Sequence, residues 1–310
     1  MTGEATTYQG WNIEYARPLG APAFNGPDSV HWRVFKNPIA LGVGGVAAVL
    51  MEFADPRIRS GVWDHSTYKV DPIGRSKRTG VAAMVGCYGP SDAARQVIQG
   101  VTRMHARVKG KTPAGEAYKA LDPELLDWVS ATASYGFLNA YDRFVAPLTG
   151  AEKTRFYREG TPIARLYGAR VIPQSSAEFL GLMDTLSDRF EPHPIVTEFL
   201  DIIQSGKAAP GTPKFLHRAL ARAAVSILPP TVRRKLALGP EYDLTTFDRM
   251  ALRLAGAIAD RRAVPGSPPS EACVRMGLPA DFLYRSRSAQ ARILAEAGMS
   301  GTSLAPSPAE

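Results

Sequence analysis

The amino-acid sequence predicts an all-α protein, and three kinds of observation support this fold class. Three Asp-Pro pairs, beginning at Asp55, Asp71 and Asp122, each stand before a segment of helical character. Apolar residues recur at spacings of three and four, as on one face of a helix. The alternation that is typical of strands is scarce, and residues 169–173 are the best short candidate for a strand. With a usual helix length of about 11 residues, roughly ten to twelve helices are expected.

The Asp-Pro pairs predict helix starts because each residue suits its position. The Asp carboxylate accepts backbone N–H groups that would otherwise be unpaired, and the fixed φ of Pro suits the first helical residue. Ser175 with Glu178 predicts a capping box before Phe179. The apolar segment 39–53 predicts a helix that packs closely through its glycines. No strand–helix–strand unit surrounds these glycines, so they do not indicate dinucleotide binding.

Composition excludes several classes of protein. The chain has 310 residues, of which 45% are apolar and 21% charged, which is typical of a globular protein with a sizeable core. The net charge of +8 is compatible with bound anionic groups or simply with a basic surface. No run of five basic residues occurs, so nucleic-acid binding is not expected. The two cysteines, Cys87 and Cys273, exclude a disulfide framework and suit a reducing compartment.

We expect a soluble, cytoplasmic protein with one helical domain. The N-terminus lacks the basic-then-apolar order of a signal peptide. The longest apolar run, residues 39–51, is shorter than the about 20 residues that a membrane span requires. Residues 1–25 are predicted to be a flexible arm, 26–300 the helical domain, and 301–310 a disordered tail.

Two predicted helices carry the candidate functional residues. On the first, residues 72–87, Arg75, Arg78 and Thr79 share one face at spacings of three and four. This face is either solvated or the polar wall of a pocket, in which guanidinium groups would bind a carboxylate or an oxygen species. On the second, residues 91–108, His105 falls within an apolar row that includes Val101.

Histidine can serve several roles at such positions. His105 is either a core residue or a metal or haem ligand, since neutral imidazole is the commonest metal-binding side chain. His65 is either a helix-terminal residue stabilised by the helix dipole or a residue that lines a pocket. No His-x-x-x-His or Cys-x-x-Cys pair occurs, so a zinc site is not expected.

Six ordered segments together resemble a known family. They are Met-Glu-Phe-Ala-Asp-Pro at 51–56, Gly-Val-Trp-Asp-His-Ser at 61–66, Asp-Pro-Ile-Gly-Arg-Ser-Lys-Arg-Thr at 71–79, Met-His-Ala-Arg-Val-Lys-Gly at 104–110, Tyr-Lys-Ala at 118–120, and Asp-Pro-Glu-Leu-Leu-Asp-Trp-Val at 122–129. The series is similar to the haem b oxygenases that include the MpaB proteins and the latex-clearing rubber oxygenases. The likeness covers roughly residues 30–240.

The resemblance implies a globin-like core that encloses haem b. It implies that His105 is the proximal ligand of the iron, and that Arg75 and Thr79 face the iron from the distal side. Arg78 matches a basic position that is lysine in the rubber enzymes, and His65 is a further candidate for cofactor binding. The family chemistry, in its studied members, is oxidative cleavage of an isoprenoid C=C bond to carbonyl products.

The sequence also departs from the family pattern. Without an export signal, an extracellular polymer is not the expected substrate. Ser130 stands where many relatives have histidine, and the acidic base proposed for the rubber enzymes has no evident counterpart. We therefore expect a haem b-dependent oxygenase or oxidase that uses dioxygen or peroxide on a small apolar or isoprenoid-like metabolite, with natural-product tailoring as one setting. Two alternatives remain: a haem sensor or carrier without turnover, and a helical protein that has lost haem.

Overall fold

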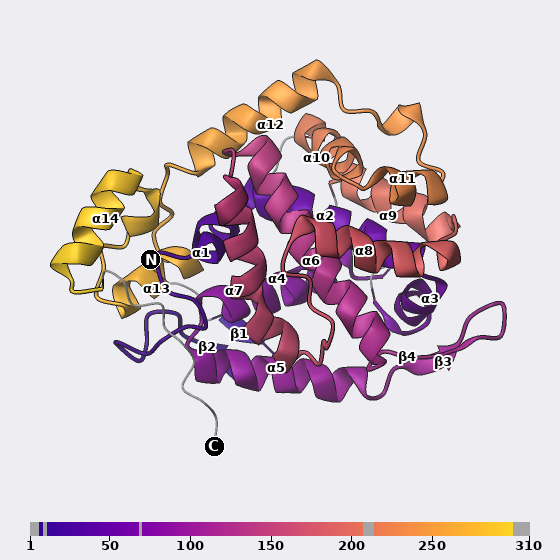
Figure 1. Cartoon of the computed structure of the whole chain (residues 1–310), viewed down its shortest axis with the longest axis horizontal. Coiled ribbons are helices and arrows are strands. Elements are labelled where there is room, and N and C mark those ends of the chain that lie inside the picture. The colour runs from indigo at the N-terminus through magenta and orange to yellow at the C-terminus, as the bar shows by residue number, and fades with distance from the viewer. Residues whose placement is uncertain (1–5, 9–10, 68–69, 207–213, 300–310) are drawn as a thin grey trace.

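The computed structural model describes residues 6–8, 11–67, 70–206 and 214–299. This part of the chain is mostly helical, which confirms the predicted class (Figure 1). Its α-helices are α1 (Val30–Phe35), α2 (Pro38–Ala54), α3 (Pro56–His65), α4 (Pro72–Tyr88), α5 (Ser91–His105), α6 (Pro123–Phe144), α7 (Gly150–Leu166), α8 (Ser176–Leu186), α9 (Pro194–Gln204), α10 (Lys214–Ser226), α11 (Pro230–Lys235), α12 (Thr246–Ala259), α13 (Pro268–Arg275) and α14 (Arg287–Glu296). These fourteen helices of the described chain exceed the expected ten to twelve because several, such as α1 and α11, have only six residues.

Strands are confined to two small antiparallel hairpins in the described residues. β1 (Thr6–Tyr8) pairs with β2 (Trp11–Ile13), and β3 (Lys109–Lys111) pairs with β4 (Ala117–Lys119). The strand predicted at residues 169–173 was wrong, because this segment is irregular. Its backbone instead bonds to a side chain: the Arg170 N–H donates to the Asp127 carboxylate on α6.

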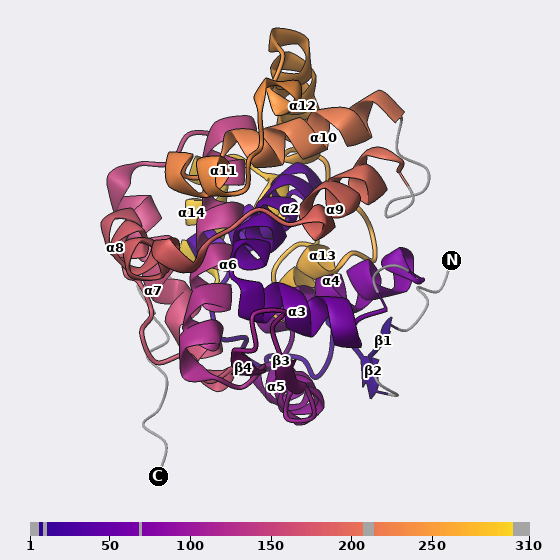
Figure 2. The same cartoon turned by 90° about the vertical axis from the view of Figure 1, so that its right-hand side faces the viewer.

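The centre of the molecule is the crossing of α2 and α6, which lie side by side in both views (Figures 1 and 2). Gly44 and Gly136 let the two backbones approach closely, since a Cβ atom at Gly44 would lie 2.7 Å from the Cα of Phe137. The buried indole of Trp128 donates to the Met51 carbonyl at 3.1 Å. The prediction of a helix packed through its glycines is confirmed.

All three Asp-Pro pairs begin helices as predicted. Asp55, Asp71 and Asp122 are the N-caps of α3, α4 and α6, and each carboxylate accepts a first-turn N–H. At the fourth predicted start, the Ser175 hydroxyl accepts the Glu178 N–H, but the Glu178 carboxylate accepts the backbone N–H of Gln174 rather than that of Ser175.

The described part of the first 25 residues packs onto the helical body. Ile13, Tyr15 and Ala23 are buried, and the guanidinium of Arg275 on α13 donates to the carbonyls of Tyr15 and Ala21. A few apolar residues of this stretch therefore pack into the core, although its composition is typical of an arm. Because they show no periodicity, the sequence pattern did not predict their burial. The predicted tail, 301–310, lies outside the described residues.

No single helix of the described chain is long and apolar enough to cross a bilayer. The pair α2 and α3 meets the length and composition criteria together, but the pair bends by 108°. Asp55, which caps both helices, lies at this bend, and most of the apolar side chains of α2 are buried in the core.

Candidate active site

His105 is the last residue of α5 and lies on the packed side of this helix. Ile98 and Val101 precede it at helical spacing and are buried, and the His105 side chain is itself partly buried. The helix ends three residues before the predicted end at Val108. The Val108 carbonyl accepts the Ala120 N–H at the base of the β3–β4 hairpin, and this pairing draws the chain out of the helix.

The surroundings of His105 favour a neutral imidazole. Burial lowers the pKa of His105 from its ordinary value of 6.5, so the ring is largely unprotonated near neutral pH. Its side chain makes no hydrogen bond or ion pair with another residue of the described chain. A neutral imidazole keeps one unshared electron pair on a ring nitrogen, as a metal ligand must. His105 is therefore chemically suited to ligation.

The three candidates on α4 have different surroundings. Arg78 is half-exposed, where it donates to the Thr67 hydroxyl at 2.9 Å and lies 3.5 Å from the Asp71 carboxylate. Thr79 is exposed. Arg75 is partly buried, and its charge acts on Glu52 of α2. Among these three residues, Arg75 is the one whose charge acts on an ionisable side chain of the interior, Glu52.

Glu52 lies in the last turn of α2, with Thr132 of α6 opposite it. The Thr132 hydroxyl is 3.5 Å from the Glu52 carboxylate, and it donates at a shorter 2.9 Å to the Val129 carbonyl. Its bond to Glu52 is therefore weak. The Glu52 carboxylate thus lies in the interior, where it accepts one long hydrogen bond and is acted on by the positive charge of Arg75.

Burial raises the pKa of Glu52 to about 7, although the charge of Arg75 and the hydroxyl of Thr132 act in the opposite direction. A carboxyl group with this pKa gains and loses a proton near neutrality, as an acid–base group must. Sequence reasoning missed this residue. The available signal was that Glu52 is the one charged residue in the apolar segment that forms α2.

The remaining sequence candidates lie elsewhere. His65 is the last residue of α3 and is exposed, and its side chain makes no hydrogen bond or ion pair with the other candidates among the described residues. Ser130 is partly buried on α6, two residues before Thr132. The structure therefore brings Arg75 and Glu52 together and leaves His65 and Arg78 toward solvent.

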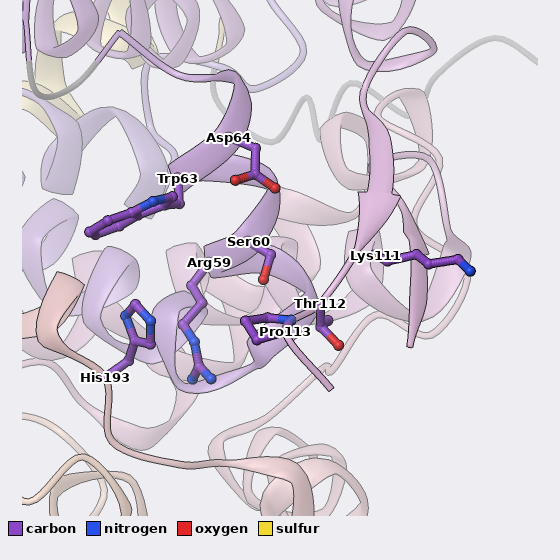
Figure 3. A pocket seen from close by; sticks show the side chains of 8 residues that line it. All are labelled: Arg59, Ser60, Trp63, Asp64, Lys111, Thr112, Pro113 and His193. Atoms are coloured by element: carbon purple, nitrogen blue, oxygen red, sulfur yellow. The ribbon is translucent and has the colours of Figure 1, made fainter. Parts of the chain in front are cut away.

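A hollow of about 270 Å³ lies between α3, the end of β3 and the segment before α9 (Figure 3). Trp63, Arg59 and His193 face one another across it, whereas Lys111 points away (Figure 3). The Arg59 guanidinium pairs with the Glu191 carboxylate, and the Trp63 ring meets the His193 ring edge-on at 5.6 Å. None of Arg75, Arg78, Thr79 or His105 lines this hollow.

The family of the chain follows from its match to a known family model. Residues 32–261 match the model of the family described as ER-bound oxygenase mpaB/B'/rubber oxygenase, catalytic domain. The chain belongs to this family. The match includes α2, α4 and α5, and thus Glu52, Arg75 and His105. No curated protein and no solved structure matches the chain.

This membership confirms the resemblance that the six sequence segments indicated. It places the chain in an oxygenase family and implies dioxygen as a substrate.

Proposed function

We propose that this chain is a haem b-dependent oxygenase or oxidase that acts on a small apolar or isoprenoid-like metabolite. The observation that carries the proposal is the neutral imidazole of His105, which has no hydrogen-bond partner among the described residues, in the catalytic domain of an oxygenase family. Dioxygen, or peroxide, would be the second substrate.

The donor set fits haem better than a metal ion held by protein alone. No three His, Cys, Asp or Glu side chains of the described chain lie together where they could hold an ion. Haem brings four nitrogen ligands of its own, so the protein needs one axial donor and an apolar slot. His105 would be the donor, and α4, which packs beside α5, carries the partly buried apolar side chains Val81, Ala82 and Met84, which would suit such a slot.

The protein residues divide into binding and proton-handling groups. Bound haem would supply the redox chemistry. His105 would hold the iron, and Arg78, with its half-exposed guanidinium, would bind a propionate. Thr79 is proposed to orient the reacting molecule through its hydroxyl. Glu52 would hold or release a proton near neutral pH, while the charge of Arg75 favours its ionised form.

The test is the visible absorption spectrum of the purified protein and of His105→Ala, each before and after dithionite and carbon monoxide. We expect a strong Soret band in the wild type, and its loss or shift in His105→Ala. His193→Ala is the matched control, since His193 lies outside the proposed site, and it should keep the wild-type spectrum. A wild type that takes up no added haemin would contradict the proposal.

The non-catalytic alternative, a haem sensor or carrier, predicts the same spectra. Oxygen uptake with apolar candidate substrates separates the two, because only an oxygenase or oxidase consumes oxygen in proportion to substrate. We place the protein in the cytoplasm in this proposal, and the two buried free thiols, Cys87 and Cys273, are compatible with a reducing compartment.

A further inference from the structure

The helix α12 lies at the outer edge of the molecule, at the top of both views (Figures 1 and 2). Its inner face packs on α2, α6 and α10. Leu252 and Gly256 are buried there, and the Asn37 side-chain amide donates to the Gly256 carbonyl at 2.9 Å. The helix is therefore held firmly by one face, and its opposite face is free for another contact.

That opposite face carries a continuous row of large apolar side chains. Phe247, Met250, Leu254 and Ile258 are 69%, 67%, 64% and 54% exposed. Their spacings of three, four and four keep them on one line of the helix. With 3.6 residues per turn, Leu254 lies about 200° around the axis from buried Leu252. A flat surface laid against the molecule at α12 would meet these side chains first.

The row, which we call the α12 stripe, extends beyond its own helix. The ring of Phe215, an exposed residue of α10, lies 6.5 Å from the ring of Phe247. Val264, just beyond α12, is also exposed. Scattered single apolar residues are ordinary on a surface, but a contiguous group of this kind marks an interaction site.

The charges beside the α12 stripe are positive. Arg253, Arg261 and Arg262 are exposed and have no ion pair with another described residue. Both acidic residues of this region are occupied: Asp248 pairs with Arg222 at 3.0 Å, and Asp260 with Lys36 at 3.3 Å. An apolar row flanked by arginines is the pattern of a helix that lies in the surface of an anionic membrane.

A second copy of the chain suits this face less well. The 14 residues of α12 span about 21 Å, and with a helix width of about 10 Å the footprint is roughly 200 Å². A stable dimer buries about 800 Å² on each partner. Two α12 stripes in contact would also bring six arginines together without a free carboxylate of α12 to balance them.

We propose that α12 is a membrane-surface helix, which inserts its stripe between the headgroups of an anionic bilayer while its arginines bind lipid phosphates. This is a peripheral attachment and needs no membrane span. It does not depend on haem, and it predicts that the protein is recruited reversibly by charge and apolar contact together.

The experiment is co-sedimentation of the full chain with vesicles of phosphatidylcholine alone or with about a third phosphatidylserine, a content that gives a strongly negative surface. We expect binding to the anionic vesicles, and binding that is roughly tenfold weaker or more for the neutral vesicles and at high salt. The double variant Met250→Ser/Leu254→Ser should lose binding by a similar factor. Arg253→Gln/Arg261→Gln should weaken only the anionic preference.

A matched control changes exposed apolar residues outside α12. Val171→Ser/Leu180→Ser should bind anionic vesicles like the wild type, and circular dichroism melts verify that each variant folds. Vesicle binding that survives in Met250→Ser/Leu254→Ser would overturn the proposal. So would a wild type that ignores anionic vesicles but forms a dimer by light scattering that this variant loses, since the α12 stripe would then join two copies.

Discussion

Two carboxylates only three residues apart, Asp55 and Glu52, have contrasting surroundings at the break between α2 and α3. Asp55 is fully buried and accepts three N–H bonds from Arg57, at 2.8 Å from the backbone and at 3.1 and 2.7 Å from the guanidinium. Glu52 has one long contact from a hydroxyl that prefers another acceptor.

This difference in hydrogen-bond partners separates a structural role, that of Asp55, from a chemical one, that of Glu52. A buried carboxylate that is fully hydrogen-bonded to an arginine holds a backbone break in place, and removing it leaves an uncompensated buried charge. A buried carboxyl with incomplete partners keeps its proton into the neutral range, where it is able to exchange it. The same functional group, a carboxyl, at two positions three residues apart thus serves stability in one case and, as we propose, proton transfer in the other.

The largest effect is expected for Asp55→Ala. It removes the N-cap of α3 and leaves the Arg57 guanidinium with only the Glu124 carboxylate. We expect a loss of about 3–5 kcal/mol in the free energy of unfolding, measured by denaturant titration. The control is Asp122→Ala, which removes an Asp-Pro cap whose carboxylate accepts a backbone N–H, that of Glu124, and should cost about 1 kcal/mol. Equal losses would show that the Arg57 pair adds nothing.

Glu52→Gln should instead change the pH dependence of stability. In the unfolded chain Glu52 titrates near 4.5, and in the folded protein near 7. Between these values the folded state binds the extra proton, so this contribution to stability is lost as the pH rises from about 4.5 through 7. Above pH 7 the wild type should be less stable than Glu52→Gln by at most about 3 kcal/mol, whereas the two should be alike near pH 4.

Denaturant titrations across this pH range give the comparison directly. Glu296→Gln, which changes an exposed carboxylate of α14, is the control and should leave the shape of the curve unchanged. Parallel curves for the wild type and Glu52→Gln would mean that Glu52 does not hold a proton in the folded state. If Glu52 also serves in turnover, the activity of Glu52→Gln should lose its dependence on a group near pH 7.

The starts of helices were predicted from the sequence more accurately than their ends. The Asp-Pro caps of α3, α4 and α6 depend on two adjacent residues, so local chemistry was enough to predict them. The end of α5 at His105 depends on a hairpin partner twelve residues beyond Val108, Ala120, which no local pattern contains. The burial of Tyr15 likewise depends on Arg275, at the other end of the chain.

The surroundings of the candidate residues were predicted where one helix face carries the information. The partial burial of His105 was predicted because Ile98 and Val101 place it on a packed face, whereas its role as a ligand remains a prediction. Glu52 was missed because its role depends on Thr132 and Arg75, which come from two other helices. Whether Arg75 and Thr79 face the iron, as the family resemblance implies, remains a prediction.

The smallest effects test the weak partners of Glu52. Arg75→Gln removes a positive charge that favours the ionised carboxylate, so the pKa of Glu52 should rise further, and the variant should lose about 1 kcal/mol of stability above pH 7. Near pH 5, where Glu52 is protonated in both proteins, the loss should vanish. Thr132→Val, of similar volume, removes the 3.5 Å contact to Glu52 together with the 2.9 Å bond to the Val129 carbonyl. Loss of the former should cost the ionised form of Glu52 about 0.5 kcal/mol. Infrared titration of the protonated carboxyl band, assigned by its absence in Glu52→Gln, measures both shifts. A downward shift in either variant would contradict the assignment of Arg75 and Thr132 as groups that stabilise the ionised form.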